Sequence, residues 1–291
     1  MSEEAFGYFT YYPVHGVPEI AAVLFAAVAI ISTLQIMNTN SARWFYILVG
    51  TAVAECFGYI FRSICIDHVT LGLFICMNLC LLLPPNALAL FNYKVLAEVA
   101  RQSNVSESRF YLRPRFIVWF FFASDVFSFL LQSTGAGMTI KQETATNGRW
   151  ICIGGLGIQM VFLTSFVVLA TLIMRDPRYA VLEGDKDGAG KGSKMHVLWT
   201  VHATTALIYI RSIYRLVEFI DGYGGDIYSA EWAFYVFDSI MILLAFVIYI
   251  VVFLGWYFPK SSASHRVQLY ELQRAEEAWS GRTRARRYSN Q

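Results

Sequence analysis

Residues 208–238 read IYIRSIYRLVEFIDGYGGDIYSAEWAFYVFD, and this stretch decides the class of the protein. Two arginines and a glutamate lie within an apolar run. A glycine turn then leads to a second apolar run that contains Glu231 and Asp238. An ionisable side chain at bilayer depth costs several kcal/mol unless it is paired or reaches water. Charges in this setting therefore indicate a functional site rather than a scaffold.

The composition of the whole chain indicates a membrane protein. Hydrophobic residues make up 56% of the chain and charged residues 15%, against about 25% charged in an average soluble domain. Seven apolar runs are each near the ~20 residues that cross a hydrocarbon core. They cover 18–37, 44–63, 69–97, 116–136, 151–174, 196–219 and 232–255. We therefore expect an all-α, polytopic bundle of seven transmembrane helices, with a kink at Pro84 and Pro85 in the third.

Lysine and arginine are distributed unevenly between the predicted loops. They are frequent after the third, fifth and seventh apolar runs, whereas residues 1–17 and the loop between the last two runs have none. The positive-inside rule therefore places the N-terminus outside and the C-terminus in the cytosol. We expect a short extracytoplasmic N-terminus (1–17), a transmembrane domain (18–258) and a basic cytosolic tail (259–291). The tail either contacts anionic lipids of the inner leaflet or is a disordered segment.

Polar residues recur at helical spacing within the predicted helices. Residues at i, i+3 or i+4, and i+7 share one face of a helix, and polar faces of membrane helices normally point into the bundle. The predicted topology places these faces in the outer half of the membrane, where five carboxylates and three arginines would line one polar cavity. A slight acidic excess would suit a ligand with a cationic head group, although a purely structural role as interhelical salt bridges stays open. The residues are Glu55, Tyr59, Arg62, Asp125, Ser128, Gln132, Gln159, Arg211, Tyr214, Arg215, Glu218, Glu231, Tyr235 and Asp238.

These residues carry a resemblance to a known family that spans roughly residues 45–255. The pattern resembles the fungal RTA-like family of lipid-translocating exporters, whose members are associated with resistance to aminocholesterol and sphingoid bases and with protoporphyrin uptake. The resemblance implies binding or movement of amphipathic molecules at the plasma membrane, linked to stress and drug resistance. It adds Tyr93 to the candidate substrate-binding residues. Besides these, the matching residues include Gly58, Pro85, Gly135-Ala136-Gly137, Gly155 and Leu156.

A translocator of sphingoid bases, sterol amines or porphyrin-like molecules is the function that this resemblance favours. No Walker A loop is visible, so the chain shows no ATPase of its own. Coupling to protons would need a buried carboxyl, and Glu55, Asp125 and Asp238 are the candidates, because low dielectric disfavours the charged form. We expect membrane lipids or amphipathic small molecules as partners, and neither nucleic acid nor a cofactor.

Two other function classes fit parts of the pattern. A seven-helix lipid sensor, which binds such ligands without moving them, has the same predicted geometry. An intramembrane zinc hydrolase needs several histidines or carboxylates that converge on one ion. Of the five histidines only His202 lies clearly at membrane depth, away from the acidic residues. We therefore expect no enzyme activity.

Two cysteines leave a further alternative open. Cys65 and Cys152 fall near the extracytoplasmic ends of their helices, where an oxidising environment permits a disulfide. Free cysteines are also common in membrane helices, so the sequence does not choose between a bridge and two thiols.

Overall fold

The computed structural model describes residues 14–39, 41–68, 70–102, 114–139, 143–176, 190–222, 225 and 230–258. The basic tail with its predicted lipid contact, and residues 1–13 of the predicted N-terminal segment, lie outside these ranges. The long helices are α2 (Val17–Asn38), α3 (Tyr46–Asp67), α4 (Leu71–Gln102), α5 (Pro114–Thr139), α6 (Ala145–Arg175) and α7 (Gly190–Asp221). A last helix consists of α8 (Glu231–Phe234), the π-helical segment η4 (Tyr235–Ile240) and α9 (Met241–Val251). Two 3₁₀ turns, η1 (Arg43–Phe45) and η5 (Leu254–Trp256), flank the bundle.

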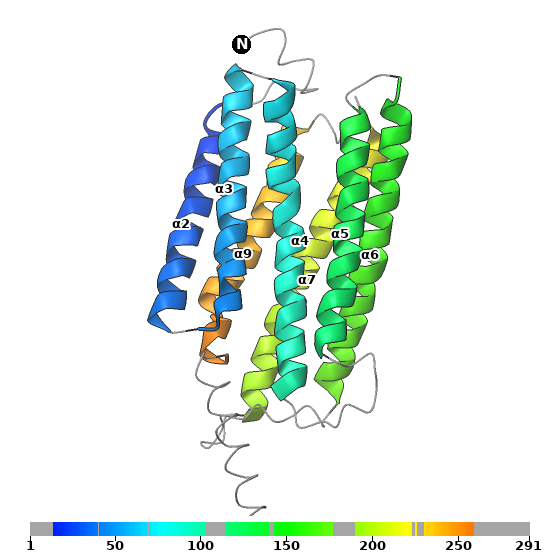
Figure 1. The fold of residues 1–291 in the computed structure, drawn as a ribbon. Coiled ribbons are helices and arrows are strands. Elements are labelled where there is room, and N and C mark those ends of the chain that lie inside the picture. The colour runs from blue at the N-terminus through cyan, green and yellow to red at the C-terminus, as the bar shows by residue number, and fades with distance from the viewer. Residues whose placement is uncertain are drawn as a thin grey trace, which may run out of the picture.

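The helices run side by side in one bundle (Figure 1). From α2 to α7 each helix packs against the next one in the chain, α7 packs against α9, and α9 closes the ring against α2. Figure 1 shows α2 at one edge, α5 and α6 at the other, and α7 and α9 behind α4. A contact between α4 and α7 crosses the middle of the ring, so these two helices bound the polar interior.

Six helices in the described part of the chain are long and apolar enough to span a membrane. The remaining long helix, α7, is less apolar because it carries the arginines and the glutamate of the 208–238 stretch. Its 32 residues correspond to about 48 Å at 1.5 Å per residue, more than the ~30 Å hydrocarbon core requires. It packs against α4, α6 and α9, so its charges are enclosed by the other helices. The prediction of an all-α, polytopic membrane protein is confirmed, whereas the orientation of the termini stays a prediction.

Two prolines lie inside α4 without ending it. The helix continues through Pro84 and Pro85 to Gln102. Proline has no backbone N–H, so Pro85 leaves the carbonyl of Leu81, four residues earlier, without its helical hydrogen bond. Arg211 of α7 supplies the missing donor, because its Nη2 lies 3.1 Å from the Leu81 oxygen. A neighbouring helix thus satisfies the freed carbonyl, as membrane helices require.

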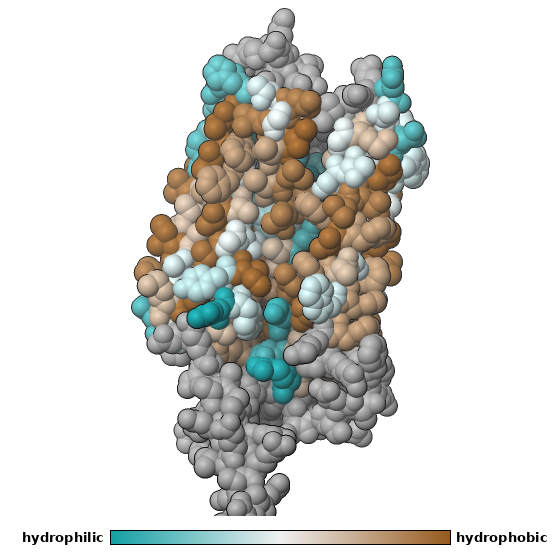
Figure 2. Space-filling model, viewed as in Figure 1, coloured by the Kyte–Doolittle hydropathy of each residue, from teal (hydrophilic) through white to brown (hydrophobic). Residues whose placement is uncertain are grey.

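The bundle carries large apolar side chains on its outside and encloses charged side chains within a mainly apolar core. Large exposed residues such as Ile20, Val161 and Trp199 cover the helices, and Figure 2 shows mainly hydrophobic colour along their length. Glu55, Asp125 and Asp238 are each 3% exposed. A water-soluble domain differs in both respects, because its charged residues lie mainly on the surface and are almost never fully buried.

Candidate functional site

Asp238 is the centre of a buried group of ion pairs between α7 and η4. Its Oδ1 lies 2.8 Å from Nε of Arg215 and 3.0 Å from Nε of Arg211. Arg215 also donates from Nη1 to Oε2 of Glu218, at 3.1 Å. Two guanidinium groups therefore face two carboxylates, and the charges balance at a depth where an unpaired charge would be costly. We call Asp238, Arg211, Arg215 and Glu218 the charged layer.

The π-helical segment explains how consecutive residues of η4 both point inward. A π turn adds a residue to the α-helical turn and is frequent at functional sites. Asp238 and Ser239 are both buried; the first reaches the arginines of α7 and the second reaches α3. Ser239 forms a hydrogen bond with the hydroxyl of Tyr59. The segment thus connects the charged layer with α3.

Arg62 of α3 contacts α8 and η4 beside the charged layer. Its Nη2 lies 3.7 Å from Oε1 of Glu231, and its Nε donates to the hydroxyl of Tyr235 at 3.3 Å. Its guanidinium also lies 4.3 Å from the ring centroid of Phe234, a cation–π contact. Because Arg62 is only 3% exposed, these contacts replace water around its charge.

Glu55 of α3 is a buried residue beside the charged layer. Glu55 lies within electrostatic range of Asp238, Arg211 and Arg215 but forms no ion pair with them in the described part of the chain. The Nε of Arg211, close to Asp238 Oδ1, has no partner there at hydrogen-bond geometry. The Glu55 carboxyl group is therefore available to a polar ligand, whereas the Arg211 Nε is held in the ion pair with Asp238. Tyr214 completes the contact between the helices by stacking on Phe237, with ring centroids 5.7 Å apart.

A second, uncharged group connects α4, α5 and α6. Gln132 donates to Gln159 at 2.7 Å, and Gln159 donates to Asn86 at 2.8 Å. Asn86 was not among the predicted site residues, although a polar amide directly after Pro85 in an apolar run was a readable signal. The two glutamines meet because Gly155 leaves little space between its helix and α5. A Cβ added there would lie 3.0 Å from the Ser128 carbonyl oxygen.

Asp125 lies in a third place, beside the hydroxyl of Tyr93. The Tyr93 ring packs between Phe121 and Phe166, with centroid distances of 5.2 and 4.6 Å. Asp125 Oδ2, the Tyr93 hydroxyl and Ser128 Oγ have no hydrogen-bond partner among the described residues. The candidate residues predicted to line one cavity thus fall into three groups: those around Asp238, the glutamine pair, and Asp125 with Tyr93.

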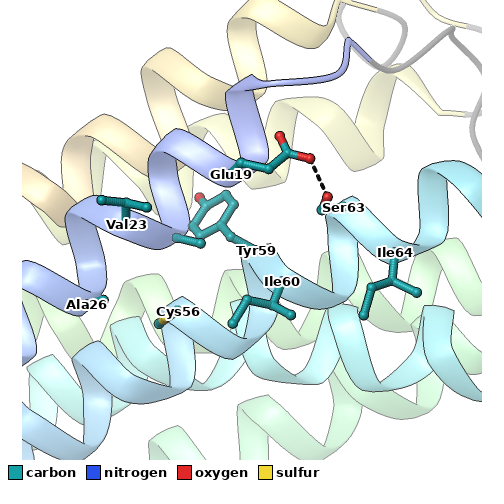
Figure 3. Close-up of a pocket in the computed structure, with 9 residues that line it drawn as sticks. Glu19, Val23, Ala26, Cys56, Tyr59, Ile60, Ser63 and Ile64 are labelled. Carbon is teal, nitrogen blue, oxygen red and sulfur yellow. Dashed lines mark hydrogen bonds between the residues drawn. The ribbon is translucent and has the colours of Figure 1, made fainter.

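A hollow of about 440 Å³ lies between α2 and α3, at the edge of the bundle (Figure 3). Its lining shares only Tyr59 with the predicted site residues. We call this hollow the α2–α3 groove; it is lined by Glu19, Ala22, Val23, Ala26, Cys56, Tyr59, Ile60, Ser63 and Ile64.

Among the described residues, no histidine side chain joins the three polar groups, and the Cys152 thiol donates to the Gln132 carbonyl oxygen at 3.3 Å. No three His, Cys, Asp or Glu side chains in the described ranges lie close enough to hold a metal ion. The ring of His202 contacts the Leu198 carbonyl oxygen at 2.8 Å and the Thr171 hydroxyl at 3.1 Å. Cys65 and Cys152 are both free thiols, so the disulfide considered from the sequence is not formed.

The fold and its interior define a polytopic helical membrane protein with a charged layer enclosed by the bundle. The chain belongs to the RTA1 like protein family, whose profile matches residues 47–261. This confirms the family resemblance. No solved structure matches the chain.

Named relatives come from fungi. Protein RTA1 of Saccharomyces cerevisiae is 30% identical over 279 residues, which cover 87% of this chain and 86% of that protein. Protoporphyrin uptake protein 1 of the same species is 30% identical over 200 residues, covering 68% and 65%. Sphingoid long-chain base transporter RSB1, also from Saccharomyces cerevisiae, is 25% identical over 259 residues, covering 76% and 67%.

Proposed function

We propose that this protein moves amphipathic lipids or lipid-like compounds across the plasma membrane, and that the charged layer accommodates their polar head groups. The observation that carries the proposal is the group around Asp238, in which two arginines and two carboxylates are enclosed by a bundle with an apolar exterior. The names of related proteins, a sphingoid base transporter and a protoporphyrin uptake protein, support the same class of substrate.

The physical problem in moving an amphiphile is its head group. A polar or charged group costs several kcal/mol at the centre of a bilayer, whereas the alkyl chain is stable in the hydrocarbon core. Glu55 supplies a buried carboxyl group that forms no ion pair among the described residues, and the arginines of the charged layer lie within electrostatic range of it. These groups would replace the water that the head group loses. The apolar exterior of the helices would leave the chain in contact with lipid.

The proposal assigns transport and no enzyme activity to the chain. It is tested with the purified full chain in liposomes, with a fluorescent long-chain amine added to one leaflet. A quencher added outside the vesicles then reports how fast the amine moves from one leaflet to the other. Vesicles with the folded protein should move the amine faster than protein-free vesicles and vesicles with the heat-unfolded protein.

Sensing is the outcome that would replace this proposal. If the protein binds the amine saturably, and the rate of movement equals that of protein-free vesicles, the chain is a receptor rather than a translocator. Binding and movement are measured in the same vesicles, so that one preparation separates the two functions.

A further inference from the structure

The α2–α3 groove has a shape and a lining that the charged layer does not explain. It opens at the side of the bundle, because α2 is the edge helix and its Val23 side chain is 68% exposed. From Glu19 to Ala26 the lining follows two turns of α2, or about 10 Å at 1.5 Å per residue. The volume of about 440 Å³ falls toward the small end of ligand pockets, which span roughly 300–1,000 Å³. The groove is therefore suited to one alkyl chain rather than to a two-chain phospholipid.

Small side chains make the hollow. Ala22 and Ala26 of α2 and Cys56 of α3 line the hollow, and none of these three short side chains fills the space between the two helices. The Tyr59 ring forms the inner wall and stacks on Phe25, with centroids 5.5 Å apart. Below the first turn of α2 the lining is apolar, which suits a hydrocarbon chain.

One end of the groove is polar. Glu19 accepts hydrogen bonds from the Gly16 N–H, at 2.8 Å, and from the hydroxyl of Ser63 (Figure 3). A carboxylate has about four lone-pair sites, so these contacts leave about two for a ligand. The side chain of Glu19 is exposed and lies in the first turn of α2, so its negative charge is at the end of the membrane span, where a lipid head group belongs.

We infer that the α2–α3 groove is a lateral binding site for a single-chain amphiphile with a protonated amine head group. The head group pairs with Glu19, and the chain follows the groove toward the middle of the bilayer. This inference rests on the proposed function, because the groove would be the site that binds the substrate before the substrate enters the bundle interior. Tyr59 connects the two places, since its ring lines the groove and its hydroxyl bonds to Ser239, next to Asp238.

A photoactivatable single-chain amine with a diazirine in its chain tests the site on the full chain in liposomes. Peptides from α2 and α3 that contain the groove residues should carry the label. Ala26→Phe fills the groove and should lower the labelling of these peptides about tenfold, as a loss of 1.4 kcal/mol of binding does. Ala27→Phe is the matched control, because Ala27 is exposed and does not line the groove. Equal labelling of the two variants would overturn the inference.

The head group is tested with Glu19→Gln and with an alcohol of the same chain length. The variant should lower labelling by the amine about fivefold, in keeping with a weak exposed ion pair, and leave labelling by the alcohol unchanged. If the alcohol labels the wild-type groove as strongly as the amine, the groove holds bulk lipid chains and the inference fails. Transport measured in the same vesicles separates the proposals. If the groove peptides are labelled but the amine is not transported, only the proposed transport function is contradicted. If Ala26→Phe transports the amine as fast as the wild type, only the inferred groove site is contradicted.

Discussion

Pro85 and Arg211 form a residue-scale pair that joins α4 to α7. The proline frees the Leu81 carbonyl, and the arginine donates to it at 3.1 Å while its Nε faces Asp238 at 3.0 Å. The proline thus gives Arg211 a fixed position in a buried site. The family resemblance identified Pro85 as a matching residue without a reason, and this contact supplies one.

The pair predicts a double-mutant cycle. Pro85→Ala restores a backbone donor to the Leu81 carbonyl, so Arg211→Ala should destabilise the Pro85→Ala protein less than the wild type. We expect an interaction free energy of about 0.5–3 kcal/mol, measured from unfolding in detergent. Additive effects of the two substitutions would show that the carbonyl contact contributes nothing.

Asp238 predicts a large loss of stability on neutralisation. Asp238→Asn leaves Arg211 and Arg215 opposite Glu218 alone, and breaking a buried ion pair from one side costs about 3–5 kcal/mol. Asp125→Asn is the control, because Asp125 is also 3% exposed but lies beside Tyr93 rather than an arginine. It should cost less than the Asp238 substitution, because it leaves no arginine without its counter-charge. Thermal unfolding measures the stability of both variants. Equal losses of stability would show that the ion pairs of Asp238 do not stabilise the protein beyond what a buried carboxyl group does.

At the scale of elements, the glycines of α5 and α6 set how closely these helices approach. A Cβ added to Gly135 would lie 2.6 Å from the Gly148 carbonyl oxygen, and a backbone atom cannot rotate away. Close approach through small residues is a common means of packing membrane helices.

Gly135→Ala should therefore destabilise the protein by about 1–3 kcal/mol, the usual cost of overpacking. Gly154→Ala is the matched control, because nothing lies within 4 Å of its added Cβ. In a helix interior alanine is favoured over glycine by about 1 kcal/mol, so the control should be neutral or more stable. A comparison of melting temperatures decides, and a loss at Gly154 as large as at Gly135 would contradict the packing account.

Helix periodicity predicted the spans and the polar faces but not the pairing between helices. The spacing of Glu231, Tyr235 and Asp238 assumes an α-helix, whereas the π turn also brings Ser239 inward. Which carboxylate meets which arginine depends on contacts between distant parts of the chain, and periodicity contains no such information. Among the described residues the candidate side chains contact one another in three groups, and a single cavity that joins them stays a prediction.

At the scale of the whole molecule, the bundle encloses charge and presents hydrocarbon to lipid. Composition and apolar runs were sufficient to predict that architecture, because the bilayer restricts a spanning chain to few structures. The α2–α3 groove was missed because alanine and cysteine on an apolar helix have no distinctive pattern. A hollow depends on what the facing helix leaves unfilled, and only the packed structure shows it.

The central claim is that the charged layer accommodates the head group of a moving amphiphile, and Glu55 tests it most directly. Glu55→Gln keeps the size of the side chain and breaks no ion pair in the described structure. Glu143→Gln removes an exposed carboxylate outside the helices and serves as the control. The measurement is the rate at which a fluorescent long-chain amine crosses liposomes that contain each folded variant. We predict that Glu55→Gln slows the movement at least about tenfold, because a hydrogen bond to a charged group is worth about 1.5–3 kcal/mol. Movement by Glu55→Gln as fast as by Glu143→Gln and the wild type would contradict the account.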